Sequence, residues 1–237
     1  MAALTERRFP DLQSLSEALA KRLAVLLAEA IEVRGKATAA LSGGNTAALV
    51  FAALARNGMA RNGLARNRLA GMALDWSRVT LTLIDDRWVS LDHADSNEGL
   101  VKQHLPAAGV VSLKTDDVDP RQAEAEVARR LGVFAGPFDA VYLGLGPDGH
   151  VASLFPDDPT WLSRKGRVHG VPAIKDRQPR ISLLPDRLFD TRVVLIGFGG
   201  ADKAGVWKRA KSQGSVQDLP CRLVLDQDRA PVEAFIA

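Results

Sequence analysis

Apolar residues recur at two spacings along the chain, one typical of helices and one typical of buried strands. Near the start they are three or four positions apart, which predicts an amphipathic helix of about twenty residues. These residues are Leu15, Leu19, Leu23, Leu26, Leu27 and Ile31. Ser14 and Glu17 form a capping-box pair that predicts the start of this helix, and Gly35 predicts its end.

Short runs of mostly apolar residues predict strands, and the run at residues 140–145, in which no polar residue alternates, predicts a strand that is buried on both faces. The clearest runs are residues 37–41, 79–84, 140–145 and 192–197. Weaker strand candidates are residues 110–113, 180–184 and 221–225. The segments between them predict helices at residues 47–54, at residues 120–131, and from a cap at residues 95–97 through Leu105. Residues 161–178 form a polar, basic connection without a clear period.

Strands that alternate with helices predict an α/β fold, in which helices cover both faces of a mostly parallel sheet. We therefore expect a three-layer αβα architecture of the Rossmann-like kind. No stretch of low complexity divides the sequence, so we expect residues 1–237 to form one domain.

Composition places the chain among ordinary globular proteins, since hydrophobic residues make up 46% and charged residues 25% of it. The net charge of +3 is a small surplus, which argues little for nucleic acid and is compatible with a small anionic substrate. Cys221 is the single cysteine and forms no intramolecular disulfide. Because the longest aliphatic run, residues 23–28, is too short for a bilayer, we expect a cytoplasmic protein without membrane contact.

Residues 55–69 contain a near repeat of five, A-R-N-G-M, A-R-N-G-L, A-R-N-R-L. Clustered arginines invite a nucleic-acid interpretation. A period of five, however, rotates successive arginines by about 140° around a helix, so they do not line one face. We interpret the repeat as a tandem expansion of a surface helix or loop, and we expect no nucleic-acid partner.

The richest chemistry lies after the predicted strand at residues 140–145. The sequence there breaks into a turn in which glycines 144, 146 and 149 let the backbone bend and approach a ligand. Asp148 and His150 lie two positions apart in that turn. A carboxylate at this spacing can fix the tautomer of the imidazole and stabilise it when it takes a proton, which predicts a general base.

Two other interpretations of this turn remain. Its glycines spell GxGxxG, the pattern of a dinucleotide site, but a Rossmann turn opens a long helix and here Pro156 and Pro159 interrupt the following segment. No acidic residue follows about twenty positions later, as such a site requires; residues 165–169 are basic. The other interpretation is a purely structural turn in which His150 is merely hydrogen-bonded.

Two further segments carry polar groups at the ends of predicted strands. Residues 42–46, S-G-G-N-T, join a strand to a helix, and the free amides of a helix N-terminus bind anions. This segment lacks the P-loop lysine, so a nucleoside triphosphate is not expected, and a plain turn capped by Asn45 or Thr46 is the alternative. Asp85, Asp86 and Arg87 follow another strand, at the edge where open α/β sheets bind ligands.

Taken together, these segments resemble the 6-phosphogluconolactonases, relatives of the glucosamine-6-phosphate deaminases, over most of the chain. The most specific motif is L-G-L-G-P-D-G-H-V-A-S-L-F-P at residues 143–156. Weaker ones are L-S-G-G-N-T at 41–46, I-D-D-R-W-V at 84–89, D-S-N at 95–97, R-I-S at 180–182, and Lys203 after a pair of glycines.

This resemblance implies the fold of the sugar-phosphate isomerases and deaminases, and hydrolysis of 6-phosphoglucono-δ-lactone to 6-phosphogluconate without a cofactor or metal. It implies a small-molecule partner, the phosphorylated sugar lactone, and we expect a monomer or weak homo-oligomer. The expected catalytic residues are His150, Asp148, Asp85 and Arg87. The substrate phosphate is expected against Gly43, Gly44, Asn45, Thr46, Arg180 and Lys203.

The deaminases share the glycine turn, but their segment resembles D-G-H-I-A-F-N-E-P, with a glutamate that takes part in acid–base work on the sugar amine. Phe155 stands at that position and cannot carry a proton, which favours the lactonase. A glucosamine-6-phosphate deaminase-like isomerase, a sugar-phosphate-binding protein without catalysis and a degenerate scaffold remain as alternatives. A regulator of this fold needs a DNA-reading domain, and no spare segment supplies one.

The chain departs from the usual lactonase pattern at a few positions. Asn45 stands for Ser or Thr, Asp86 for Glu and Val151 for Thr; Ala47 and Ser90 each stand for Pro. Asn45 keeps a side-chain donor, so we expect phosphate binding to survive. The other histidines, at positions 93, 104 and 169, lack acidic or cysteine neighbours at the spacing of metal ligands, so we expect no metal site.

Overall fold

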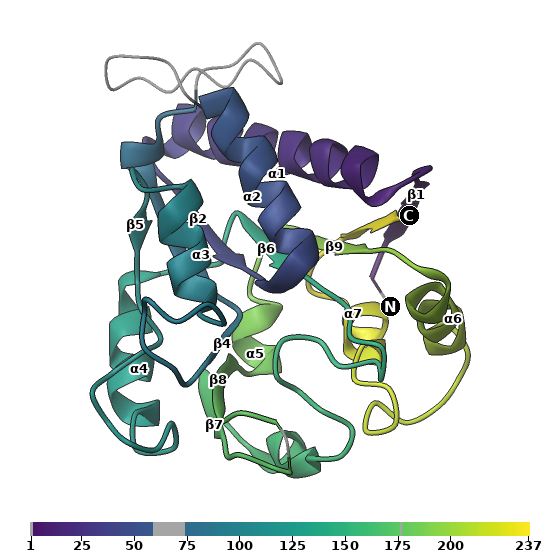
Figure 1. Cartoon of the computed structure of the whole chain (residues 1–237). Helices are drawn as coiled ribbons and strands as arrows, with labels where there is room; N and C mark the ends of the chain where they lie inside the picture. The colour runs from purple at the N-terminus through teal and green to yellow at the C-terminus, as the bar shows by residue number, and fades with distance from the viewer. Residues whose placement is uncertain (1, 59–73, 176) are drawn as a thin grey trace.

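The computed structural model describes residues 2–58, 74–175 and 177–237, and within them a parallel sheet forms the centre of the molecule (Figure 1). The strands run in the order β1-β10-β9-β6-β2-β3-β5, and every neighbouring pair is parallel. Their bounds are Leu4–Arg8 (β1), Ala37–Leu41 (β2), Val79–Leu83 (β3), Gly109–Val110 (β5), Ala140–Leu143 (β6), Val194–Phe198 (β9) and Val232–Ile236 (β10). The predicted parallel sheet is therefore confirmed.

A small antiparallel sheet lies below the large one in Figure 1. It consists of β4 (Asp85–Arg87), β8 (Arg180–Leu183) and β7 (Val168–Val171), in that order. The segment 180–184, predicted as a strand, belongs to this sheet, and the connection 161–178 contains β7. Because β4 follows β3 directly, the small sheet is held at the carboxyl end of the large one.

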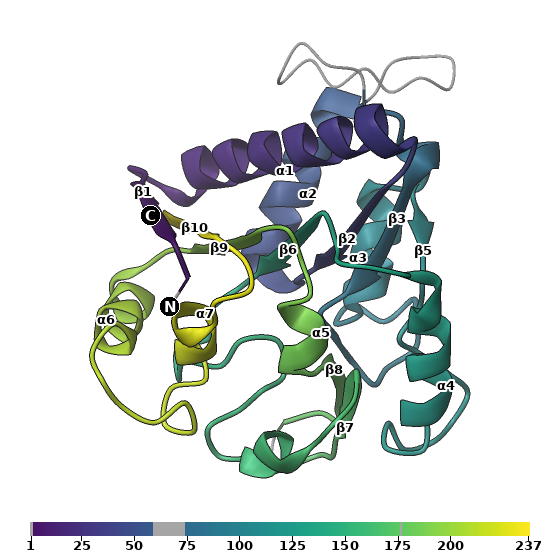
Figure 2. The same ribbon diagram turned by 180° about the vertical axis from the view of Figure 1, so that it is seen from behind.

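Helices cover both faces of the central sheet, as Figures 1 and 2 show. On one face α1 (Leu12–Arg34) and α2 (Gly44–Gly58) lie side by side, and α5 (Pro185–Leu188), α6 (Ala201–Ala210) and α7 (Arg222–Asp226) lie toward the other. The remaining elements are α3 (Asn97–His104), α4 (Glu124–Arg130) and the 3-10 helices η2 (Trp76–Arg78), η3 (Leu131–Val133) and η4 (Pro159–Ser163). The three-layer αβα arrangement is as predicted.

The central strands are apolar because helices pack on both of their faces. Every residue of β6 and β9 is buried, as is all of β2 except Thr38, which is half-buried. This burial explains why these strands appear in the sequence as short, mostly apolar runs. It also fixes where their carboxyl ends lie, since the strands are in register with one another.

The start of α1 differs from its prediction. The helix begins at Leu12, and Asp11 caps it by accepting a hydrogen bond of 2.7 Å from the backbone N–H of Ser14. The Ser14 and Glu17 capping box is therefore wrong: Asp11 takes its place three residues earlier and satisfies the free amide. The end is as predicted, since Gly35 adopts a left-handed conformation with φ 74°.

Segment 221–225 is helical, although its apolar run predicted a strand. It forms α7, in which the N–H of Val224 donates to the carbonyl of Cys221 at 3.1 Å. The last strand is β10, further along the chain. Two other predictions were too long: segment 110–113 keeps its strand only up to Val110, and helix α4 begins at Glu124 instead of residue 120.

The repeat at residues 55–69 extends beyond the described residues, so the prediction that it lengthens a surface helix or loop stays a prediction. Only its first part belongs to α2, which ends at Gly58. Among the residues that the structure describes, no helix is long and apolar enough to cross a membrane.

Candidate active site

The carboxyl ends of β2, β6 and β9 surround an open cavity of about 240 Å³, which the small sheet closes on one side. All of the predicted site residues except Asp148 line it. They come from far apart in the sequence: residues 43–46 from the turn after β2, Asp85 and Arg87 from β4, His150 from the turn after β6, Arg180 from β8, and Lys203 from α6.

His150 and Asp148 form a tight pair. Their turn is closed by two backbone hydrogen bonds, from Gly146 N to His150 O at 2.9 Å and from Gly149 N to Gly146 O at 3.1 Å. Asp148 Oδ1 lies 2.5 Å from His150 Nδ1. Burial acts to raise the pKa of Asp148, but the hydrogen bond and charge of His150 outweigh it, so the pKa lies below its usual value. The ionised carboxylate therefore favours a proton on Nδ1 and leaves the lone pair on Nε2.

Two glycines are required for this turn. A Cβ on Gly146 would lie 2.1 Å from His150 Nδ1, so any side chain there would displace the imidazole. Gly149 has φ 90°, a conformation that side chains strain, and a Cβ there would lie 2.7 Å from the side chain of Leu219. The glycine pattern of the sequence therefore reflects close packing around His150, and no long helix follows it.

The turn after β2 presents the N-terminus of α2 to the same cavity. Gly44 begins the helix with φ 83°, and Asn45 and Thr46 follow in its first turn. The backbone N–H groups of a first helical turn have no intrahelical partner and carry the positive end of the helix dipole. In Figure 1 this end of α2 lies near the centre of the molecule, while its other end is at the top. The arrangement suits an anion.

Asn97 joins this turn to the acidic segment. A Cβ on Gly43 would lie 1.8 Å from Asn97 Oδ1, so the turn and the start of α3 are in direct contact. Asn97 Oδ1 accepts from Arg87 Nη1 at 2.5 Å, and Asn97 Nδ2 donates to the carbonyl of Asp85 at 2.9 Å. In the sequence, Asn97 is visible only as part of the D-S-N motif at residues 95–97. Its role in holding Arg87 depends on a contact between distant segments.

Asp85 and Arg180 lie together on the small sheet. Asp85 Oδ2 accepts a hydrogen bond of 2.6 Å from Ser153 Oγ and lies 3.7 Å from Arg180 Nη1. Both side chains are largely buried, and both line the cavity. Burial lowers the pKa of Arg180, and the charge of Asp85 opposes that effect. The two residues thus bring a carboxylate and a guanidinium to the same wall.

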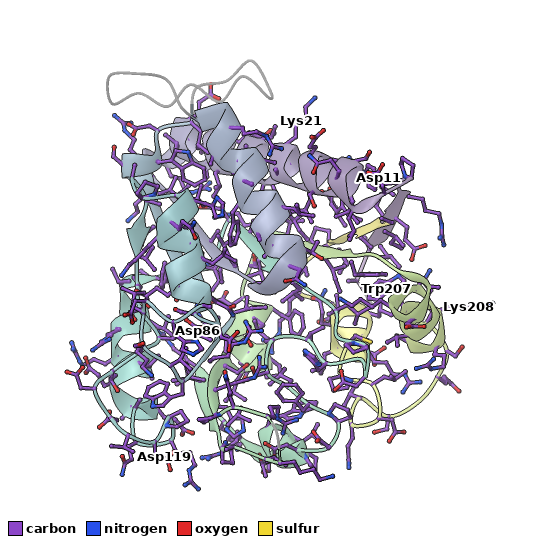
Figure 3. All side chains as sticks on the ribbon, in the orientation of Figure 1. Asp11, Lys21, Asp86, Asp119, Trp207 and Lys208 are labelled. Carbon is purple, nitrogen blue, oxygen red and sulfur yellow. The ribbon has the colours of Figure 1, made fainter. Side chains whose placement is uncertain are left out.

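Asp86 points elsewhere, although it is adjacent to Asp85. Its carboxylate accepts from three backbone N–H groups, those of Arg87 at 2.8 Å, Asn97 at 2.7 Å and Glu98 at 3.0 Å. Figure 3 labels it at the base of α3. Burial raises its pKa to about 6, against the effect of these hydrogen bonds. Asp86 therefore anchors the N-terminus of α3 and does not line the cavity.

Tyr142, at the inner end of the cavity, was not singled out from the sequence. It is fully buried in β6, and its hydroxyl has no hydrogen-bond partner in the described part of the chain. Within residues 2–58, 74–175 and 177–237 no group of three or more His, Cys, Asp or Glu side chains could hold a metal ion. The chemistry available in the cavity is one imidazole–carboxylate pair, one further carboxylate and several cations.

Comparison with known proteins shows which sequences and structures this chain is similar to. A family model described as "Glucosamine-6-phosphate isomerases/6-phosphogluconolactonase" matches residues 10–232. The 6-phosphogluconolactonase of Mesorhizobium japonicum is 35% identical over 242 residues, which cover 97% of this chain and 93% of that protein. The Caulobacter vibrioides 6-phosphogluconolactonase is also 35% identical, over 246 residues, 97% of this chain and 95% of that one. A crystal structure of a 6-phosphogluconolactonase from Shewanella baltica superposes with a TM-score of 0.86 at 30% identity, over 100% of this chain and 97% of that one.

Proposed function

The chain belongs to the family of glucosamine-6-phosphate isomerases and 6-phosphogluconolactonases, and from that membership we propose that it hydrolyses 6-phospho-D-glucono-1,5-lactone to 6-phospho-D-gluconate. Its relatives at 35% identity bear the name of that activity. The observation that carries the proposal is that His150, which Asp148 holds, lines the same cavity as the helix N-terminus at residues 43–46. His150 offers a base to this cavity, and the helix N-terminus offers an anion site.

His150 acts as the general base. A lactone is an activated ester, so water can attack it directly when a base takes its proton. Nε2 of His150 accepts that proton as the water oxygen bonds to C1 of the lactone. The bond from C1 to the ring oxygen then breaks, and the ring oxygen takes the proton from His150. The carboxylic acid that forms ionises and releases one proton per turnover.

Asp148 holds the imidazole through Nδ1 and stabilises the imidazolium that forms when Nε2 is protonated. Negative charge grows on the carbonyl oxygen during the attack, and donors placed beside that oxygen lower the barrier. Arg87, which Asn97 fixes at the cavity wall, and the backbone amides of the turns serve this purpose.

The substrate phosphate binds at the opposite end. The amides of residues 43–46 meet its oxygens, and Lys203 and Arg180 supply positive charge. Asp85 orients Arg180 from a distance of 3.7 Å and accepts a hydrogen bond from a sugar hydroxyl. The phosphate contacts are equal before and during the reaction, so they contribute to binding, whereas His150 contributes to the rate.

The deaminase alternative requires a proton-carrying group beside His150. The ring of Phe155 occupies this place, with its centre 4.6 Å from that of the imidazole. An aromatic hydrocarbon cannot serve in the isomerisation that accompanies deamination. This contact favours lactone hydrolysis over the sister activity.

We also propose that the chain acts as one domain over residues 1–237, as a monomer or weak homo-oligomer in the cytoplasm, without a nucleic-acid partner. In support, β1 from the start of the chain pairs with β10 from its end, so both ends contribute to one sheet. The net charge of +3 is small.

Proton release decides the function. Freshly prepared 6-phosphogluconolactone is mixed with the protein in weak buffer, and acid production is followed with spontaneous hydrolysis subtracted. We expect acid production to rise in proportion to protein concentration, and we expect no ammonia from glucosamine 6-phosphate. A rate equal to the spontaneous one, or release of ammonia, contradicts the proposal.

A further inference from the structure

Phe155 is held rigidly under the catalytic turn. The chain reverses at Ala152, which has φ 51°, and the N–H of Leu154 donates to the carbonyl of Val151 at 3.1 Å. The carbonyl of Phe155 then accepts a hydrogen bond of 3.0 Å from the buried indole of Trp161. With 4% of its surface exposed, the ring has little freedom to move.

One face of this ring meets His150. The ring centres are 4.6 Å apart and the planes are tilted by 47°. Asp148 holds the imidazole only at Nδ1, and a single hydrogen bond allows the ring to turn about that contact. The backbone of Gly146 blocks one direction, since even a Cβ there would reach the imidazole, and Phe155 provides a second barrier. The imidazole is thus held at three points.

Two guanidinium groups lie over the ring of Phe155. The Cζ atom of Arg177 is 3.8 Å from the ring centre, and that of Arg180 is 5.5 Å from it. A cation over an aromatic face is attracted to the ring, and Arg177 Nη1 donates a hydrogen bond of 2.7 Å to Asp157 Oδ1, which holds Arg177 in place. The ring of Phe155 therefore contacts both the imidazole and the guanidinium of Arg177.

We propose that Phe155 is a positioning residue for the hydrolytic reaction: it holds the His150 imidazole with Nε2 available to the cavity and keeps the guanidinium of Arg177 away from it. The inference rests on the proposed function, because it takes His150 as the base. It assigns to Phe155 a role beyond the absence of a carboxylate at that position.

Replacing Phe155 with leucine keeps an apolar side chain but removes the flat ring. The imidazole can then turn away from the attacking water, and a small misplacement of a reacting group costs up to about a hundred-fold in rate. We therefore expect Phe155→Leu to lower kcat about ten-fold to a hundred-fold. KM stays within about two-fold, because the phosphate contacts are intact.

Phe134 offers a matched control. It is equally buried, at 4% exposed, and its ring lies 5.0 Å from that of Phe138 with the guanidinium of Arg187 5.7 Å away. It does not line the cavity. Phe134→Leu thus removes a ring from a similar aromatic and cationic environment, and we expect its kcat to stay within two-fold of the wild-type value.

The experiment combines kinetics with proton NMR of the unliganded protein. Two results together support the proposal. The first is a lower kcat of Phe155→Leu with an unchanged KM. The second is an NMR contact between the ring protons of His150 and Phe155, with ring-current shifts of the His150 signals that vanish in Phe155→Leu. The proposal is overturned if the kcat of Phe155→Leu stays within two-fold of the wild-type value, or if the kcat of Phe134→Leu falls by as much as that of Phe155→Leu. It is also overturned if the wild-type protein lacks the NMR contact. The contact is measured without substrate, so failure of the lactonase assignment is recognised separately, as an inactive wild-type protein.

Discussion

Two buried polar groups near the cavity differ in how well they are satisfied. The carboxylate of Asp86 accepts three backbone hydrogen bonds, whereas the hydroxyl of Tyr142 has no partner in the described part of the chain. An unpaired buried hydroxyl costs the folded state about 1–3 kcal/mol. Burial also raises the pKa of Tyr142, so the phenol stays protonated. These two side chains allow predictions about stability that do not involve catalysis.

Phenylalanine at position 142 keeps the ring and removes only the unpaired oxygen. We expect Tyr142→Phe to leave the free energy of unfolding unchanged or to raise it by up to about 1 kcal/mol, since no hydrogen bond is lost. Denaturant unfolding of both proteins measures this difference. A loss of more than about 1 kcal/mol would mean that the hydroxyl is bonded in the folded protein.

Asp86 links stability to pH. Its pKa is about 6 in the folded protein, above the ordinary value of 3.8, so the folded state binds the proton more tightly than the unfolded state does. The resulting stabilisation is complete below about pH 4 and is lost as the pH rises through about 6. Relative to Asp86→Asn, the free energy of unfolding of the wild-type protein should rise by up to about 3 kcal/mol from pH 7 to pH 4. Each unit of pKa difference contributes about 1.4 kcal/mol. Denaturant unfolding of both proteins at pH 7 and pH 4 measures this rise. If the two proteins differ by the same free energy of unfolding at both pH values, the raised pKa is contradicted.

At the scale of elements, two turns at the ends of strands shape the cavity. The turn after β2 exposes the N-terminus of α2, and the turn after β6 carries Asp148 and His150. Each contains a glycine at which a side chain would collide with a functional residue, Asn97 in one case and His150 in the other.

Gly146→Ala tests the second turn. The added methyl would lie 2.1 Å from His150 Nδ1 and 2.7 Å from Asp148 Oδ1, so it must displace the pair. We expect kcat to fall about a hundred-fold, as for a misplaced reacting group. Gly132→Ala is the control, because a methyl there meets nothing within 4 Å. Steady-state kinetics in which both variants keep the wild-type kcat would show that the imidazole does not need this position.

The elements could be predicted from the sequence where burial leaves a periodic pattern. Strands β2, β3, β6 and β9 are almost wholly buried and were visible as short, mostly apolar runs. The edge strand β1, L-T-E-R-R, is mostly exposed, so its charged residues carry no strand signal. The strand prediction for residues 221–225 was wrong because a short apolar run fits a buried strand or a buried helix turn equally well. The backbone contact of Cys221 with Gly149 cannot be seen in the sequence.

The site itself was predictable as a set of motifs, because each motif concentrates glycines, acids and cations at the end of an element. What the motifs did not contain are contacts between them. Asn97 packs on Gly43, Asp86 binds the start of α3, and Phe155 contacts both His150 and Arg177.

At the scale of the whole molecule, the sheet brings His150 and residues 43–46 to one cavity, and the kinetic constants should separate the proposed base from the proposed phosphate site. Arg180→Ala removes the proposed charged contact to the phosphate, and such contacts are worth about 1.5–3 kcal/mol. We expect KM to rise about ten-fold or more, with a smaller change in kcat. Arg192→Ala is the control, because Arg192 pairs with Asp139 at 3.3 Å and does not line the cavity. An unchanged KM in Arg180→Ala would remove Arg180 from the phosphate site.

The central claim is that His150 takes the proton of the attacking water, and the kcat of His150→Ala for lactone hydrolysis tests it most directly. We expect a loss of about a hundred-fold to ten-thousand-fold, the usual contribution of a positioned general base. His93→Ala is the matched control, since His93 lies 3.8 Å from Asp95, also two residues away in sequence, but outside the cavity. A His150→Ala enzyme within a few-fold of the wild-type kcat contradicts the account.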